Sequence, residues 1–175
     1  MNVTAALLCA AISFTSADGD SYLSKDRIRV ACKYAPEVLQ AAEKHNVDPY
    51  TLAALIYYES SWFTQAKSHI GACGLTQVLP KYSQYTCKQL YNPRRSIREG
   101  AAKLRGWMDF TVRKDKQECE EKALACYNAG YLCLGSSGAR KYAKKVRDLA
   151  DLYGLHAFYQ WCEENPDDPD CDPGC

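Results

Sequence analysis

The sequence lacks the long apolar run that a membrane-spanning helix needs. No stretch of its 175 residues approaches the roughly 20 consecutive apolar residues that cross a bilayer. Strand-like alternation of apolar and polar residues is scarce, whereas apolar residues at helical spacing are frequent. No repeat, low-complexity tract or linker divides the chain. We therefore predict one all-α domain without stable membrane insertion, because 47% apolar content at this length suffices for a hydrophobic core.

The sequence also lacks cysteine and histidine at zinc-site spacing. It has no CxxC pair, and its three histidines, His45, His69 and His156, are scattered along the chain. Ten cysteines in a chain of this size favour disulfides instead. We therefore expect an oxidising compartment, either the periplasm or the outside of the cell. The pairing of the cysteines does not follow from the sequence.

Charge is missing from the first 17 residues. An apolar run over residues 5–12 precedes small residues up to Ala17, which predicts a signal peptide cleaved after Ala17, although its start lacks Lys or Arg. Residues 18–162 would then form the functional domain. Cleavage would leave nine cysteines, so that one thiol stays free, pairs with another chain, or the cleavage site is wrong.

Positive charge is lacking in residues 163–175, which hold six acids and no base. The other residues carry 22 bases and 15 acids, although the net charge of the whole chain is only +1. A basic body suits an anionic polymer, but an ordinary solvated surface with an acidic tail is an equally good explanation. Because the tail has almost no apolar residues, we expect Cys171 or Cys175 to hold it.

Helix starts are marked by capping residues followed by proline. Asp48-Pro49 and Asn92-Pro93 each begin a run with apolar residues at helical spacing. Further helices are predicted over residues 26–45, 118–127 and 139–153, with Gly154 ending the last one.

One acid lies where an apolar helix face is expected. Glu59 follows Leu52, Leu55 and Ile56 at helical spacing, on the side that faces the core. Burial beside aromatic residues raises a carboxyl pKa, and a carboxyl group that stays protonated near neutral pH can act as a general acid. From spacing alone, a glutamate that bends out to water or pairs with a lysine is the commoner outcome.

Three motifs in order strengthen the catalytic interpretation. They are residues 59–62 (ESSW), 68–80 (SHIGACGLTQVLP) and 125–130 (ACYNAG). Together they resemble the soluble lytic transglycosylase family, which has a goose-lysozyme-like fold and cleaves bacterial peptidoglycan. The resemblance extends over residues 26–150 and implies an all-α lysozyme-like domain, here with disulfide cross-links.

The resemblance implies a role for five residues. Glu59 matches the sole catalytic acid/base of the family. Ser68 and Gln77 match residues that line the sugar groove, Tyr127 matches an aromatic residue beside the acid, and Asn128 is its neighbour. Turn and capping chemistry would equally explain Ser68, Gln77 and Asn128, and core packing would explain Tyr127.

The family's activity is cleavage of the β-1,4 bond between N-acetylmuramic acid and N-acetylglucosamine, with formation of a 1,6-anhydro ring. The resemblance implies no metal or organic cofactor. We expect a monomer that binds peptidoglycan strands and no nucleic acid. A goose-type lysozyme would hydrolyse the same bond but needs a second acid, for which Glu99, Asp109 and Asp115 are candidates. Two hypotheses of a different class are a non-catalytic peptidoglycan- or chitin-binding protein and a disulfide-rich inhibitor or toxin.

The sequence departs from the family pattern at several positions. Thr76 replaces a methionine, which we expect to change the shape of a pocket wall. Gly138 stands where the family has a glutamate, although Tyr142 in the same signature matches. Cys73 and Cys126 lie inside two motifs, where we expect them to brace the groove.

Overall fold

The all-α prediction is confirmed. The structure, a computed structural model, describes residues 3–17, 22–115, 120–168 and 171. Within these residues the chain forms helices and no strand, apart from two isolated bridges that Cys73 makes with Lys67 and Val78. The elements are α1 (Ala5–Ala17), α2 (Lys25–His45), α3 (Pro49–Ser60), η1 (Pro80–Tyr82), α4 (Cys87–Leu90), α5 (Pro93–Asp115), α6 (Glu120–Ala129), η2 (Gly130–Gly135) and α7 (Ser137–Glu164).

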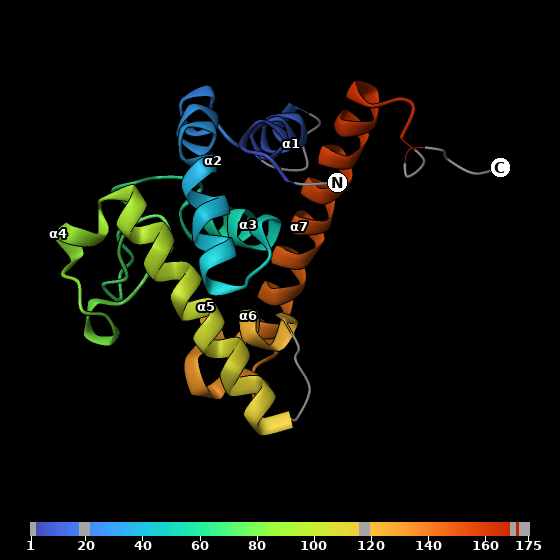
Figure 1. The fold of residues 1–175 in the computed structure, drawn as a ribbon. Coiled ribbons are helices and arrows are strands. Elements are labelled where there is room, and N and C mark those ends of the chain that lie inside the picture. Colours follow the sequence, from blue (N-terminus) through green and yellow to red (C-terminus); the bar gives the residue numbers. More distant parts are fainter. Residues whose placement is uncertain (1–2, 18–21, 116–119, 169–170, 172–175) are drawn as a thin grey trace.

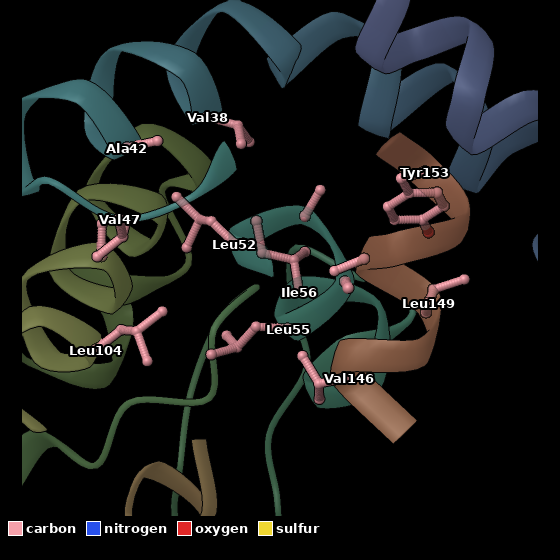
Figure 2. Close-up of a cluster of buried hydrophobic side chains, with 14 of the residues drawn as sticks. Val38, Ala42, Val47, Leu52, Leu55, Ile56, Leu104, Val146, Leu149 and Tyr153 are labelled. Carbon is pink, nitrogen blue, oxygen red and sulfur yellow. The ribbon is translucent and has the colours of Figure 1, made fainter. Parts of the chain in front are cut away.

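Helix α3 lies at the centre of the molecule, between α2 and α5 on one side and α7 on the other (Figure 1). All six residues from Thr51 to Ile56 are buried, so the helix is covered all round and not on a single stripe. Figure 2 shows its apolar side chains among those of three neighbouring helices: Val38 and Ala42 of α2, Leu104 of α5, and Val146, Leu149 and Tyr153 of α7. A helix apolar on every face is stable only inside such a core.

The predicted capping residues begin their helices as expected. The Asp48 carboxylate accepts a hydrogen bond from the Thr51 amide (2.6 Å), and Asn92 accepts one from the Arg95 amide (3.1 Å). In both cases a side chain satisfies one of the amide groups that a helix start leaves unpaired. Helix α2 continues through Pro36 to His45, close to its predicted bounds.

The predicted end of α7 is wrong. The helix continues past Gly154 to Glu164. A glycine inside a helix costs only about 1 kcal/mol relative to alanine. Burial of Tyr153 and Ala157 on either side of Gly154 outweighs that cost, and the helix therefore extends along the body instead of stopping.

Residues predicted as a signal peptide form helix α1 of the folded domain. Leu8 and Ile12 are fully buried, and α1 packs against α2 and α7. Cys9 forms a disulfide with Cys32 of α2. Cleavage after Ala17 stays a prediction, and it would remove this helix and leave Cys32 without its partner.

Four disulfides cross-link the described part of the chain. They are Cys9–Cys32, Cys73–Cys87, Cys126–Cys133 and Cys162–Cys171. The last one ties the acidic tail to α7, as expected from the tail's lack of apolar residues. Cys119 and Cys175 lie outside the described residues. Among the helices that the structure describes, none is both long and apolar enough to cross a membrane.

Candidate active site

Glu59 lies in the last turn of α3, immediately before a sharp turn of the chain. Ser61 and Trp62 both adopt left-handed backbone conformations, with φ of 46° and 60°. Such values are costly for residues other than glycine and persist only where the surroundings hold them. Here Trp62 is completely buried, and the Ser61 amide donates to the carbonyl of Tyr57 (2.7 Å). The turn therefore holds the end of α3 and the Glu59 side chain in a defined place.

The Glu59 side chain is half-buried at the end of α3. Burial raises its pKa to about 7, and a hydrogen bond that the Tyr142 hydroxyl donates to Oε1 (2.5 Å) opposes part of this rise. No charged group in the part of the chain that the structure describes contributes to the shift. The hypothesis of an exposed or lysine-paired glutamate is therefore wrong, and the carboxyl group is about half protonated near neutral pH.

Two tyrosines flank Glu59. Burial and the nearby charge of Glu59 raise the pKa of both Tyr127 and Tyr142. Both side chains are consequently neutral hydroxyls at physiological pH. Tyr127 donates its proton to the carbonyl of Thr76 (2.8 Å), and Tyr142 donates to Glu59 itself. The five predicted site residues do not include Tyr142. Its match to the family signature that begins near Gly138 is the sequence signal that identifies it.

Residues 61–92, which we call the lobe, lie between α3 and α5 and extend away from the helical body (Figure 1). The lobe has a small core of its own, formed by Cys73, Val78 and Leu90, and the Cys73–Cys87 disulfide closes it. Gly74 has a φ of +80°, and a Cβ atom there would lie 2.2 Å from the Leu90 carbonyl oxygen. Only glycine therefore fits this position.

The two predicted groove residues of the lobe form hydrogen bonds with the backbone of the lobe. Ser68 Oγ accepts from the Ala72 amide (3.0 Å), and Gln77 Nε2 donates to the Gly74 carbonyl (2.9 Å). These contacts agree with turn chemistry, and sugar binding by either side chain stays a prediction. Asn128 is exposed near the end of α6, next to Tyr127.

Thr76 does not form a pocket wall as expected. It is completely buried, and its Oγ1 donates to the carbonyl of Ser96 in α5 (2.8 Å). Its own carbonyl accepts the hydrogen bond from Tyr127. A Cβ atom on Gly100 would lie 2.4 Å from Thr76 Cγ2, so the glycine makes room for the threonine. Thr76 thus joins the lobe to α5 and to the wall of the site.

The candidate second acids are engaged elsewhere or are not described. Glu99 is hydrogen-bonded to a serine of the lobe (2.8 Å) and ion-paired with a lysine of α5 (3.4 Å). Asp109 is 55% exposed and pairs with an arginine one turn earlier on α5 (2.7 Å). The side chain of Asp115 lies outside the described residues. Neither Glu99 nor Asp109 contributes to the pKa of Glu59.

The sequence matches the family of the transglycosylase SLT domain over residues 37–150. This chain belongs to that family. The matched range contains Glu59, the whole lobe, Tyr127 and Tyr142, and therefore every residue of the candidate site. The family assignment inferred from the three motifs is confirmed.

Curated relatives of this SLT domain carry the name membrane-bound lytic murein transglycosylase F. The one from Hahella chejuensis is 37% identical over 143 residues, which are 77% of this chain and 25% of that protein. The one from Photobacterium profundum is 39% identical over 84 residues, which are 46% of this chain and 16% of that protein. The chain thus spans at most about a quarter of the length of these relatives.

A solved structure shares the fold. It is an inactive mutant of the lytic transglycosylase Slt from Pseudomonas aeruginosa, with a TM-score of 0.60 and 21% sequence identity. The similarity covers 80% of this chain and 27% of that chain. It confirms the expected lysozyme-like fold.

Proposed function

We propose that this SLT domain is a lytic transglycosylase that cleaves peptidoglycan between N-acetylmuramic acid and N-acetylglucosamine, with Glu59 as its acid/base. The observation that carries the proposal is the half-buried carboxyl group of Glu59, whose pKa is raised to about 7 beside the Tyr142 hydroxyl. Such a group is protonated often enough to donate a proton and ionised often enough to accept one. The family membership and the names of the curated relatives support the same activity.

The proposed reaction uses one carboxyl group twice. Protonated Glu59 donates its proton to the glycosidic oxygen as the bond from that oxygen to C1 of the muramic sugar breaks. The C6 hydroxyl of the same sugar attacks C1 and closes the 1,6-anhydro ring, and the Glu59 carboxylate takes the hydroxyl proton. The enzyme returns to its starting state, and no water is consumed.

The surroundings of Glu59 favour this reaction over hydrolysis. A hydrolase of the inverting type needs a second carboxylate to activate water, but among the described residues no other acid contributes to the pKa of Glu59. An attacking hydroxyl on the substrate itself is already in place, which lessens the need for a group that orients water. Hydrolysis by a goose-type lysozyme is therefore the second choice, and a purely binding role leaves the raised pKa without a use.

We assign a positioning role to Tyr142 and Tyr127. Tyr142 donates to one oxygen of Glu59 and so directs the other oxygen toward the substrate. Tyr127 is tied to Thr76 and keeps the lobe beside the acid. Ser68, Gln77 and Asn128 are proposed to line the sugar groove. The four disulfides support a location in the periplasm or outside the cell, where they persist, and we propose that the protein acts there as a monomer.

The test combines a variant with product analysis. We expect Glu59→Gln to lower peptidoglycan cleavage on the order of 10²–10⁴-fold, because the amide cannot donate or accept the proton. Asp109→Asn is the matched control and should keep full activity. Mass spectrometry of the products distinguishes the two reactions, since anhydro ends weigh one water less than reducing ends.

Full activity of Glu59→Gln would exclude the acid assignment. Products with reducing ends alone, together with loss of activity in Asp109→Asn, would show hydrolysis with a second acid instead.

A further inference from the structure

The positive charge of this protein is concentrated in one segment. Residues 61–98, which comprise the lobe and the first turns of α5, contain six bases and no acid. Outside this segment and the acidic tail, the chain carries 16 bases and 15 acids. The excess of bases that the sequence shows for the body as a whole therefore belongs almost entirely to the segment beside Glu59.

Two of the six bases have structural partners. Arg94 pairs with Glu37 of α2, and Arg98 donates to Gln40 of α2 (3.1 Å). These contacts join α5 to α2, and both arginine side chains stay exposed while they make them. Four bases are left: Lys67, Lys81, Lys88 and Arg95. No carboxylate of the described residues pairs with any of them.

Two of these four cations lie over tyrosine rings. Lys81 Nζ is 4.7 Å from the centre of the Tyr82 ring, and Arg95 Cζ is 5.1 Å from that of Tyr85. Tyr82 is 65% exposed. A cation held over an exposed ring offers a ligand both a positive charge and an apolar surface. We call this set of four bases and two tyrosines the basic face.

The basic face is held firmly and is continuous with the candidate site. The Cys73–Cys87 disulfide closes the lobe, and Thr86 forms a capping box at the start of the short helix that carries Lys88. The same lobe carries Gln77, and Thr76 ties it to Tyr127 beside Glu59. The lobe that carries the basic face is therefore attached beside Glu59.

We propose that the basic face binds the carboxylates of the peptide stems on the glycan strand that is cleaved at Glu59. This inference rests on the proposed function and specifies its substrate as stem-bearing peptidoglycan. The backbone of a stem-bearing glycan strand is neutral, because the lactyl carboxyl group of the muramic residue is joined to the stem by an amide bond, and it gains nothing from four cations. The stems carry several carboxylates at a distance from the glycan axis, which matches cations spread from residue 67 through η1 and α4 to the first turn of α5.

Binding is measured without cleavage, in the Glu59→Gln background. The test variant is Lys81→Glu/Lys88→Glu, and the matched control is Lys25→Glu/Lys145→Glu, which makes the same change in net charge on exposed positions of α2 and α7. Each protein is titrated with Gram-negative sacculi, which lack teichoic acid, and with the same sacculi after an amidase has removed the stems. The amidase leaves a free lactyl carboxylate on each muramic residue, and these carboxylates are converted to neutral methylamides by carbodiimide coupling before the amidase-treated strands are used.

We expect the lobe variant to bind intact sacculi about tenfold more weakly than the control, with a smaller dependence on salt, because two attractive charges have become repulsive. On amidase-treated strands the two proteins should bind alike. Equal binding to intact sacculi overturns the proposal. A difference that persists on amidase-treated strands also overturns it, since the ligand would then be the glycan.

A failure of the proposed function would show elsewhere. It would be seen as absence of cleavage by the chain with Glu59 intact, whereas the binding comparison needs no turnover. As a further check, soluble stem peptide should displace the control from intact sacculi and should have less effect on the lobe variant.

Discussion

The helical body and the lobe of this SLT domain are held in place by different interactions. The body buries apolar side chains from α1, α2, α3, α5, α6 and α7 in one shared core. The lobe has three buried residues in its own core and places Trp62 and Leu75 in the core of the body, and one disulfide, Gly74 and the hydrogen bonds of Thr76 fix the rest of it. A region whose stability comes from many contacts tolerates single substitutions, whereas a region whose stability depends on a few contacts is disrupted by losing one of them.

The largest effect is expected from removing a whole element of the body. Deleting residues 1–17 uncovers the surfaces of α2 and α7 on which Leu8 and Ile12 are fully buried. Each such side chain contributes about 1.5–3 kcal/mol, so thermal unfolding should show a loss of cooperativity or a drop in Tm above roughly 10 °C.

The control for this deletion is the full chain with Cys9→Ser and Cys32→Ser, which keeps α1 but lacks its disulfide. We expect it to lose less stability than the deletion. Unchanged Tm after deletion would mean that α1 is dispensable, and cleavage after Ala17 would then be compatible with the fold.

A smaller total effect, confined to the lobe, is expected from Gly74→Ala. The added methyl group would lie against the Leu90 carbonyl, at a backbone φ that only glycine adopts readily. We expect activity to be lost and about 2–4 kcal/mol of stability with it, while far-UV circular dichroism still reports the helices of the body.

The matched change in the body is Gly106→Ala. Gly106 is exposed within α5, and nothing lies within 4 Å of an added Cβ. Alanine favours a helix by about 1 kcal/mol over glycine, so this variant should be slightly more stable and fully active. Similar behaviour of the two variants would contradict the contrast between lobe and body.

A further effect is expected at the junction of the two regions, and it appears only as the pH is raised. Because burial raises the pKa of Glu59 from 4.5 to about 7, the folded state holds this proton more tightly than the unfolded state. The wild-type protein therefore loses stability as pH rises from about 4.5 through 7. Glu59→Gln does not titrate, so its advantage should grow from near zero at about pH 4 to about 3 kcal/mol at about pH 8.

Urea unfolding of both proteins at the two pH values measures this difference. If the difference in the free energy of unfolding between the two proteins is the same at both pH values, Glu59 is well solvated in the folded state. In the active enzyme, the same titration should make cleavage decline above about pH 7, where the acid form of Glu59 disappears.

Parts of the molecule with local signals were predictable. Asp48-Pro49 and Asn92-Pro93 predict helix starts. The capping side chain binds an amide in the first turn and proline fixes φ at the first helical position, so both effects act within about four residues. The three motifs located Glu59, the lobe and Tyr127, and the inward position of Glu59 followed from its spacing to Leu52 and Ile56.

Other parts depended on contacts between distant residues. From the local sequence, Gly154 predicts a helix end. Burial of its neighbours in the tertiary structure stabilises the helix beyond it, so α7 continues. Residues 5–17 resemble a signal peptide because both a secretory leader and a buried helix are short, uncharged and apolar, and only packing against α2 and α7 distinguishes them.

The sequence by itself determined the fold class, the family, the catalytic candidate and the excess of bases over acids. Only the tertiary structure decided which bases remain without a carboxylate partner, that Thr76 is a buried link, and that Tyr142 donates to Glu59 from 83 residues away. The physical reason is range: capping, periodicity and composition are set by neighbouring residues, whereas desolvation and hydrogen bonding depend on which distant side chains the fold brings together.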